Sequence, residues 1–259
     1  MKFVVAIKHV PDTETKIKIA ADGKSIEEAG VKWVVSTFDE FALQEAINLR
    51  NAGEGEVVAV GAGREASQKT LRQALAVGAD RALLINDERY ERCDALQRAT
   101  ALAAAVRAEE ADLVFLGKYG VGTDEWQTGP MLAELLGWPH VGAITKLELD
   151  GDKFTARRDV EGGVEVLEGS LPAVLTCEKG LNEPAYASLK GIMSAKKKPL
   201  DIKTPAELGI DVTDLDSPKL IWEGLEVPPA RTGAKLIDGE AHEAAATLAR
   251  LLREEAKVI

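Results

Sequence analysis

A glycine-rich segment at residues 117–129, GKYGVGTDEWQTG, has the residue types that can hold a phosphate group. It follows an apolar run of strand length, and ligands of open parallel sheets bind where the strands end. Glycine lets a phosphate approach the backbone, and the start of a helix offers unpaired N–H groups. Thr123, Gln127 and Thr128 add neutral donors. Because the segment is neither a GxGxxG nor a P-loop motif, the sequence permits both a nucleotide-binding loop and a glycine-rich turn without a ligand.

A second polar cluster, STFDE at residues 36–40, has the pattern of a helix start. In a capping box, the Thr37 hydroxyl would accept from an early helical N–H, and Glu40 would reach back. We expect a helix to begin here, beside the end of the first strand. The cluster is either this helix start alone or also a place for a base or a ribose.

A third segment, residues 181–198, combines apolar side chains with a basic run. Leu189, Ile192 and Met193 lie in a stretch with no evident core to bury them. Such exposed apolar side chains are typical of a partner surface. The run Lys196 to Lys198 is expected to be solvated.

The chain shows no convincing catalytic set and no metal site. His9, His140 and His242 have no metal-ligand spacing, and no catalytic triad order or nucleophile elbow stands out. His9, at a strand end, is either an acid–base group or a structural residue. Cys93 and Cys177 stand far apart, which favours two buried free thiols in a reducing compartment. A carrier or binding role is therefore favoured over catalysis.

Composition narrows the class of partner and the location. The 259 residues carry a formal net charge of -11, which argues against nucleic acid, because phosphate backbones require a basic surface. No apolar run approaches the ~20 residues that cross a bilayer. The first residues read as a strand rather than a signal peptide. We expect a cytoplasmic protein without membrane insertion.

The elements that must position these segments alternate between strands and helices, which predicts an α/β fold with a doubly wound, mostly parallel, Rossmann-like sheet. Continuous apolar runs predict strands buried on both faces. The helices are expected to start at the capping box, near Glu65, after Asp94 and near Thr123 or Asp124. The predicted strands lie at residues 3–7, 57–60, 82–85 and 113–116.

From Gly142 the pattern changes. Three runs, at 144–149, 153–158 and 164–167, with an Asp150–Gly151 turn and a fourth short strand at 173–176, predict antiparallel strands at the edge of the sheet. Beyond them, a proline-rich stretch predicts an extended arm that ends in an amphipathic helix from about Gly239. We therefore expect a nucleotide-binding domain at 1–180, a partner recognition loop at 181–200 and an arm with its helix at 201–259.

These segments, in this order, resemble the beta (small) subunit of electron transfer flavoproteins. The resemblance runs almost end to end, from VAIKHVPDTETKI through GVKWVVSTFDEFALQEA to ELGID. Its most specific part is LNEPAYASLKGIMSAKKKP, which follows the glycine-rich loop.

The resemblance implies a heterodimer with a larger alpha subunit that carries the redox-active FAD. The beta subunit would hold a structural AMP, or a second FAD in electron-bifurcating members. Phe38 would also approach the flavin, and Leu189, with Ile192 and Met193, would dock flavin dehydrogenases through the 181–198 loop. The implied nucleotide site comprises Ala6, Ser36, Thr37, Phe38, Asp39, Ala62, Gly117, Lys118, Tyr119, Gly120, Val121, Gly122, Thr123, Asp124, Glu125, Trp126, Gln127 and Thr128.

The implied function is an electron carrier, not an enzyme. It would pass electrons from primary dehydrogenases, such as those of fatty acid β-oxidation, to an acceptor such as a quinone oxidoreductase. Some positions depart from the family pattern. Gly122 to Glu125 replace an acidic run, Ser36-Thr37 replaces Asn-Pro, and Thr13 stands where some members have an aromatic residue. These departures leave AMP or FAD open. A stand-alone adenine-nucleotide-binding regulator is a further alternative that the 181–198 loop disfavours.

Overall fold

The computed structural model describes residues 1–53, 55–230 and 233–259. Its contacts divide the chain into two units, residues 1–224 and residues 225–259. The first unit holds the sheets and the helices α1 to α5, and the described part of the second contains helix α6.

A seven-stranded sheet in the order β12-β5-β4-β1-β6-β11-β7 forms the centre of the first unit. Every neighbouring pair in it is parallel. The runs of Val, Leu and Ile explain this, because strands covered on both faces need apolar side chains at successive positions. The strands are β1 (Lys2–Ala6), β4 (Glu56–Gly63), β5 (Arg81–Asn86), β6 (Leu113–Gly117), β7 (His140–Ile144), β11 (Ala173–Cys177) and β12 (Leu200–Lys203).

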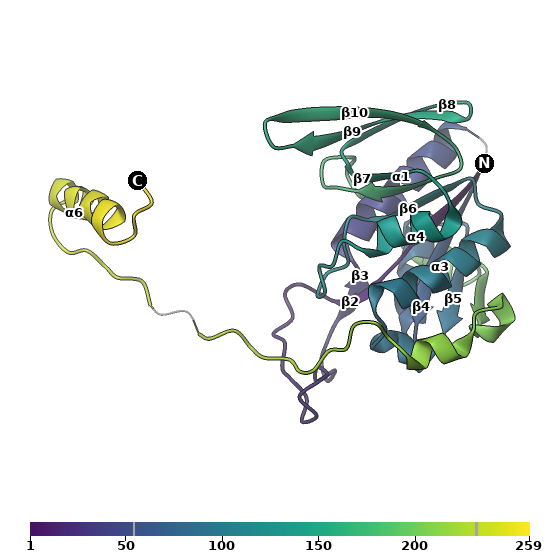
Figure 1. Ribbon diagram of the computed structural model, residues 1–259, viewed down its shortest axis with the longest axis horizontal. Coiled ribbons are helices and arrows are strands. Elements are labelled where there is room, and N and C mark those ends of the chain that lie inside the picture. The colour runs from purple at the N-terminus through teal and green to yellow at the C-terminus, as the bar shows by residue number, and fades with distance from the viewer. Residues whose placement is uncertain (54, 231–232) are drawn as a thin grey trace. The chain divides into compact units, whose positions relative to one another are not determined.

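Helices cover both faces of this sheet and bury two separate cores, which confirms the doubly wound α/β prediction (Figure 1). On one face, Phe41 and Leu71 of α1 and α2 pack with Val5 of β1. On the other face, Leu102 of α3 and Leu132 of α4 belong to the second core. The four helices are α1 (Thr37–Ala52), α2 (Gln68–Val77), α3 (Ala95–Glu109) and α4 (Thr128–Leu136).

Helical structure begins at the predicted 36–40 segment, near Glu65 and after Asp94, whereas the predicted start near Thr123 or Asp124 was wrong. Helix α1 has Ser36 at its N-cap and no side-chain cap bond, so the predicted Thr37 capping box does not form. Helix α4 begins at Thr128, not near Thr123, because the loop before it takes left-handed backbone conformations at Gly122. Asp94 caps α3 as expected, in a full capping box with Gln97.

The antiparallel strands are present, but they do not extend the edge of the main sheet as predicted. They form a separate three-stranded sheet, β10-β9-β8, with β8 at Lys146–Asp150, β9 at Lys153–Val160 and β10 at Gly163–Ser170. The fourth expected strand, β11, is parallel and lies between β6 and β7. Its five residues are all buried, a position that an edge strand cannot provide.

Short elements complete the first unit. A two-stranded antiparallel sheet pairs β2 (His9–Pro11) with β3 (Trp33–Val35). Helix α5 spans Leu189–Ala195. The 3-10 helices are η1 (Glu65–Ser67), η2 (Glu88–Glu91), η3 (Ala206–Leu208) and η4 (Val212–Asp216).

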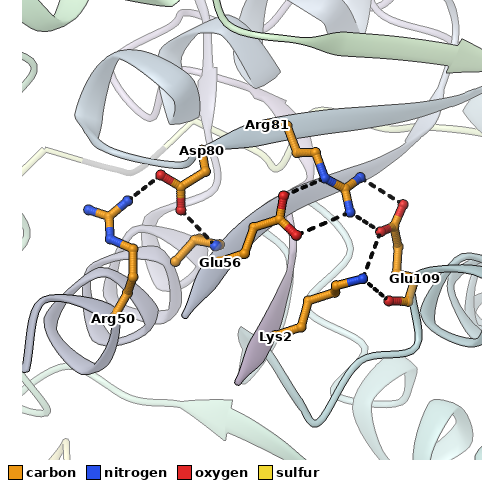
Figure 2. A network of polar contacts seen from close by, with 7 residues as sticks. Lys2, Arg50, Glu56, Asp80, Arg81 and Glu109 are labelled. Carbon is orange, nitrogen blue, oxygen red and sulfur yellow. Dashed lines mark hydrogen bonds and ion pairs between the residues drawn. The ribbon is translucent and has the colours of Figure 1, made fainter. Parts of the chain in front are cut away.

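At the amino ends of the strands an ion-pair network joins β1, β4, β5 and α3 (Figure 2). The Arg81 guanidinium lies between two carboxylates. Its Nε donates to Glu56 Oε1 at 2.7 Å and its Nη1 to Glu109 Oε1 at 2.9 Å. Beside it, Asp80 accepts from the backbone N–H of Val57 at 2.8 Å and pairs with Arg50. The network lies at the edge of the sheet opposite the carboxyl ends.

The second unit contains α6 (Ala241–Glu254), which confirms the predicted terminal helix. None of its residues is buried. Its apolar residues recur at helical spacing and form one side of the helix. They are Ala241, Ala244, Ala245, Leu248, Leu251 and Leu252.

Candidate functional site

A cavity lies at the carboxyl ends of β1, β4 and β6, against the starts of α1 and α4. This is where the topology of an open parallel sheet places a ligand site, because the loops that leave neighbouring strands diverge there. Ala6 is the last residue of β1, Ala62 is the residue before the last of β4, and Gly117 is the last residue of β6. The strands thus bring together residues that are more than a hundred positions apart in the sequence.

Asp39 holds two of these strand ends together. Its carboxylate accepts from the backbone N–H of Lys8 at 2.8 Å and from that of Gly117 at 2.9 Å. The side chain is buried, and this burial raises the pKa of Asp39 to about 7 despite the two N–H donors. The residue predicted as part of a helix cap therefore serves as a bridge between β1, α1 and β6.

Gly117 is required by the close approach of α1. A Cβ built on it would lie 2.6 Å from Phe38 Cβ and 2.6 Å from Asp39 Oδ1. Real Cβ atoms do not approach other atoms so closely, and the nearest atoms belong to the first turn of α1. Glycine at the end of β6 thus lets α1 and the glycine-rich loop share one wall of the cavity.

Lys8 reaches from the end of β1 to the glycine-rich loop. Its Nζ donates to the carbonyl oxygens of Gly120 and Val121 at 3.4 and 3.3 Å and to Thr123 Oγ1 at 2.8 Å. Burial, followed by the positive charge of Arg98, lowers the pKa of Lys8 to about 8. Lys8 therefore holds the loop and places a cation at the cavity.

Three aromatic rings surround the Lys118 ammonium at the mouth of the cavity. Its Nζ lies 4.7 Å from the Phe38 ring centroid, 5.3 Å from that of Tyr119 and 4.6 Å from that of Trp126. The ammonium also pairs with Glu178. Cation–π contacts of this kind stabilise a cation most when water is partly excluded, and the Lys118 side chain is only 14% exposed. The cage fixes the aromatic side chains at the cavity opening.

The loop before α4 adopts backbone conformations that side chains rarely take. Asp124 and Trp126 have φ of 49° and 58°, and Gly122 has φ of 97°. Left-handed conformations at residues other than glycine cost energy, and they cluster at ligand-binding loops. The backbone of this loop therefore differs from that of a simple strand–helix turn.

The structure brings most of the predicted nucleotide residues to one cavity and leaves some outside its lining. Ser36 is buried, and its hydroxyl accepts from the Val121 N–H at 3.2 Å, but neither residue is in the lining. Thr37 is exposed, and Phe38 contacts the ring of Tyr119. Gly122 and Asp124 are exposed in the loop. The predicted residues in the lining are Ala6, Asp39, Ala62, Gly117, Lys118, Tyr119, Gly120, Thr123, Glu125, Trp126, Gln127 and Thr128.

Sequence reasoning did not identify Lys8, Arg98 and Leu102 as lining residues. Lys8 follows the first strand by two positions, so a search for polar side chains after each strand could have found it. Arg98 and Leu102 come from α3, one turn apart, and no motif marks them. Only the packing of α3 against the sheet shows that they face the cavity.

The predicted docking residues lie on a short helix, and the residues before it are hydrogen-bonded to α1. Leu189, Ile192 and Met193 of α5 are 83%, 47% and 72% exposed. Asn182 Nδ2 donates to the Phe41 carbonyl of α1 at 3.0 Å and to the Glu45 carboxylate at 2.9 Å. The exposed apolar side chains are therefore presented from an anchored segment.

The other end of this segment is tied to α2. Arg72 Nη1 donates to the carbonyls of Ala195 and Lys198, at 2.6 and 2.7 Å. Lys198 Nζ donates to the carbonyls of Leu75 and Ala79 at the end of α2, at 3.1 and 2.5 Å. Lys198 is therefore not a solvated residue as predicted, whereas Lys196 and Lys197 are exposed.

His9 and the two cysteines have structural environments. His9 stacks on Trp33 with ring centroids 4.4 Å apart, and its Nδ1 lies 2.5 Å from Thr70 Oγ1. Burial, followed by the charge of Arg64, lowers the pKa of His9 to about 4, so the ring is neutral near pH 7. Cys93 and Cys177 are both free and buried, as predicted.

Among the described residues, no cluster of three or more His, Cys, Asp or Glu side chains could hold a metal ion. Within the same ranges, the helices are too short or too polar to cross a bilayer.

Comparison with known proteins gives one consistent result. A family model described as "Electron transfer flavoprotein domain" matches residues 24–208. The chain is similar to electron transfer flavoprotein subunit beta of Bacillus subtilis, with 42% identity over 264 residues that cover 100% of both chains. It is also similar to the subunit of the same name in Homo sapiens, with 39% identity over 241 residues, 92% of this chain and 93% of the relative. The corresponding Bradyrhizobium diazoefficiens protein is 42% identical over 214 residues, 82% of this chain and 85% of the relative.

Proposed function

The chain belongs to the electron transfer flavoprotein family as a beta subunit, and on this premise we propose that it pairs with an alpha subunit and carries electrons from dehydrogenases to an acceptor. Electron tunnelling needs redox centres close together and no acid–base groups. A quinone oxidoreductase is the proposed kind of acceptor.

The cavity at the carboxyl ends of β1, β4 and β6 is the observation that carries the nucleotide part of this proposal. It combines a glycine at the point of closest approach, Gly117, with a loop of left-handed residues and the start of α4. These features suit a phosphate and a flat ring. We propose that an adenine nucleotide binds there as a structural ligand, AMP rather than a second FAD. Its binding would stabilise the folded chain by mass action.

The test is to purify the chain in complex with its native alpha subunit, denature the complex, and quantify the released nucleotides by chromatography and absorbance. One FAD and one AMP per heterodimer would support the proposal. Two FAD and no AMP would make this chain a redox participant of an electron-bifurcating complex. A complex with no adenine nucleotide beyond the alpha-subunit FAD would refute the assignment of the cavity.

We further propose that the recognition segment, residues 181–200, docks the partner dehydrogenase through Leu189 of α5. Leu189 is 83% exposed, while the segment beneath it is bonded to α1 and α2. Because the segment is already held in place, little conformational entropy is lost when a partner binds, and more of the contact energy contributes to affinity.

Leu189→Ala should weaken coupling to the dehydrogenase by about 1–3 kcal/mol of docking free energy while nucleotide content stays unchanged. The measurement is the rate of flavin reduction by the native dehydrogenase at increasing dehydrogenase concentration. Val164→Ala, at a 57% exposed residue of β10, is the matched control. Equal rates for the wild type and both variants would show that Leu189 is not part of the docking surface.

We propose that residues 201–259 include an arm whose terminal helix packs on the alpha subunit. None of the apolar residues of α6 is buried within its own unit, and Leu248 is 49% exposed. Hydrogen exchange of the heterodimer tests this proposal. Slow exchange across α6 would support it, and exchange at the rate of an unfolded peptide would contradict it.

A further inference from the structure

Two cations from different elements face the nucleotide cavity. Lys8 extends from the end of β1, and Arg98 extends from the first turn of α3. Neither was among the residues that the family resemblance assigned to the nucleotide. Their presence in one cavity calls for an explanation, because like charges repel more strongly where water is partly excluded.

Within the described part of the chain, the hydrogen bonds of both side chains do not include a carboxylate. Lys8 Nζ donates to two carbonyl oxygens and one hydroxyl. Arg98 Nη2 lies 3.4 Å from the Tyr90 carbonyl and 3.2 Å from Cys93 Sγ. These acceptors are all neutral. Among residues 1–53, 55–230 and 233–259, no carboxylate lies within the 4.0 Å ion-pair distance of either cation.

Arg98 acts on Lys8 through space. After burial, the charge of Arg98 is the largest influence that lowers the pKa of Lys8. Asp39, Glu125 and Asp124 act in the opposite direction with smaller effects. Asp39 is already engaged by two backbone N–H groups, and Asp124 is exposed to solvent. Glu125 also lines the cavity, but neither it nor Asp39 forms an ion pair with Lys8 or Arg98 among the described residues, so both cations remain available to an anionic ligand.

We propose that Arg98 and Lys8 together bind the phosphate of the adenine nucleotide, and that Arg98 makes the site selective for a nucleotide over the corresponding nucleoside. This inference rests on the proposed nucleotide function and adds the residues that recognise the anion. Arginine suits this role because its planar guanidinium can donate two parallel hydrogen bonds to phosphate oxygens. Lys8 supplies a compact second charge and holds the loop through Thr123.

The experiment compares the wild-type heterodimer with Arg98→Gln, Arg98→Lys and Arg92→Gln, using AMP and adenosine as probes. Arg92 is a matched control, because its side chain is 67% exposed and pairs with Asp22 outside the cavity. Each complex is freed of bound nucleotide, its fold is checked by circular dichroism, and binding is measured by calorimetry.

We expect Arg98→Gln to bind AMP about 10- to 100-fold more weakly, as for loss of a charge-assisted hydrogen bond, with adenosine binding changed less than about twofold. Arg98→Lys should retain most of the preference for AMP, and Arg92→Gln should match the wild type. An unchanged ratio of AMP to adenosine affinity in Arg98→Gln would overturn the inference while leaving the nucleotide site intact. A wild-type complex that binds neither probe and releases no nucleotide would instead overturn the proposed function, and the inference with it.

Discussion

Replacing Arg81 with methionine should destabilise the chain more than the loss of an ordinary surface ion pair. Arg81 pairs with Glu56 and Glu109 at the amino ends of β4 and β5 and the end of α3 (Figure 2). Methionine keeps an unbranched apolar stem, so the main change is the loss of charge and donors. The side chains of Arg81 and Glu109 are 21% and 11% exposed.

The magnitude follows from that burial. Exposed pairs contribute 0–1 kcal/mol, and removing one partner of a buried pair costs about 3–5 kcal/mol. Arg81 lies between these limits, so we expect a loss of about 2 kcal/mol. In a chain of this size such a loss lowers the melting temperature by about 4–8 °C.

The assay is urea unfolding followed by circular dichroism, with Arg158→Met as the matched control. Arg158 also pairs with a glutamate, Glu165, but the two side chains are 35% and 48% exposed on the β9–β10 hairpin. Its loss should cost less than about 0.5 kcal/mol. Equal losses for the two variants would refute the argument from burial.

The pH dependence provides a second check. The hydrogen bond from Arg81 holds the pKa of Glu109 below its usual value. A carboxyl group with a depressed folded pKa contributes stability above its unfolded pKa and loses it as the pH falls through the folded value. Arg81→Met should therefore lose less stability than the wild type on acidification from pH 5 to pH 3. If the stability of the variant and of the wild type falls equally with pH, Arg81 does not lower the pKa of Glu109.

Three further substitutions test the nucleotide cavity and the recognition segment. Gly117→Ala should cost about 1–3 kcal/mol of folding free energy by overpacking and reduce nucleotide content, whereas Gly163→Ala, where a Cβ meets nothing within 4 Å, should be neutral in the same urea and nucleotide assays. Because burial raises the folded pKa of Asp39 to about 7 from 3.8, the wild type should lose stability as pH rises from 4 to 7. Asp39→Asn should cost about 1–3 kcal/mol of folding free energy, because one buried backbone N–H then faces the amide NH2 group. The stability difference between this variant and the wild type should be smaller at pH 8 than at pH 5. A difference that stays constant with pH would contradict the argument. Lys198→Met should free the end of α2 and speed amide exchange in residues 189–199, while Lys197→Met, at an exposed residue, should leave exchange unchanged.

The sequence was most informative where apolar patterning alone decides the structure. The runs at β1, β4, β5 and β6 predicted a parallel sheet, since only strands covered on both faces use such residues. Asp94 was recognised as a cap because its partner, Gln97, lies three positions away. Both signals are local.

The failures came from contacts between distant segments. Thr37 and Glu40 matched a capping box, but Ser36 is the N-cap residue of the helix, and the Asp39 carboxylate joins the ends of β1 and β6. β12 was not foreseen, because its pattern is half exposed and only pairing with β5 defines it. Arg98 was missed in the same way, since nothing near it in the sequence indicates the cavity it faces.

The position of β11 has a consequence for how the chain is made. β7 precedes β11 in the sequence, yet β11 separates it from β6. During synthesis, β7 emerges with no neighbour in the main sheet until residues 173–177 have followed it. The three strands between them, β8 to β10, form local antiparallel pairs that can close first, because short loops cost little entropy to close. A released fragment that ends before residue 173 should therefore contain the small antiparallel sheet and a protease-sensitive β7, and β7 should join the central sheet only in fragments that include β11.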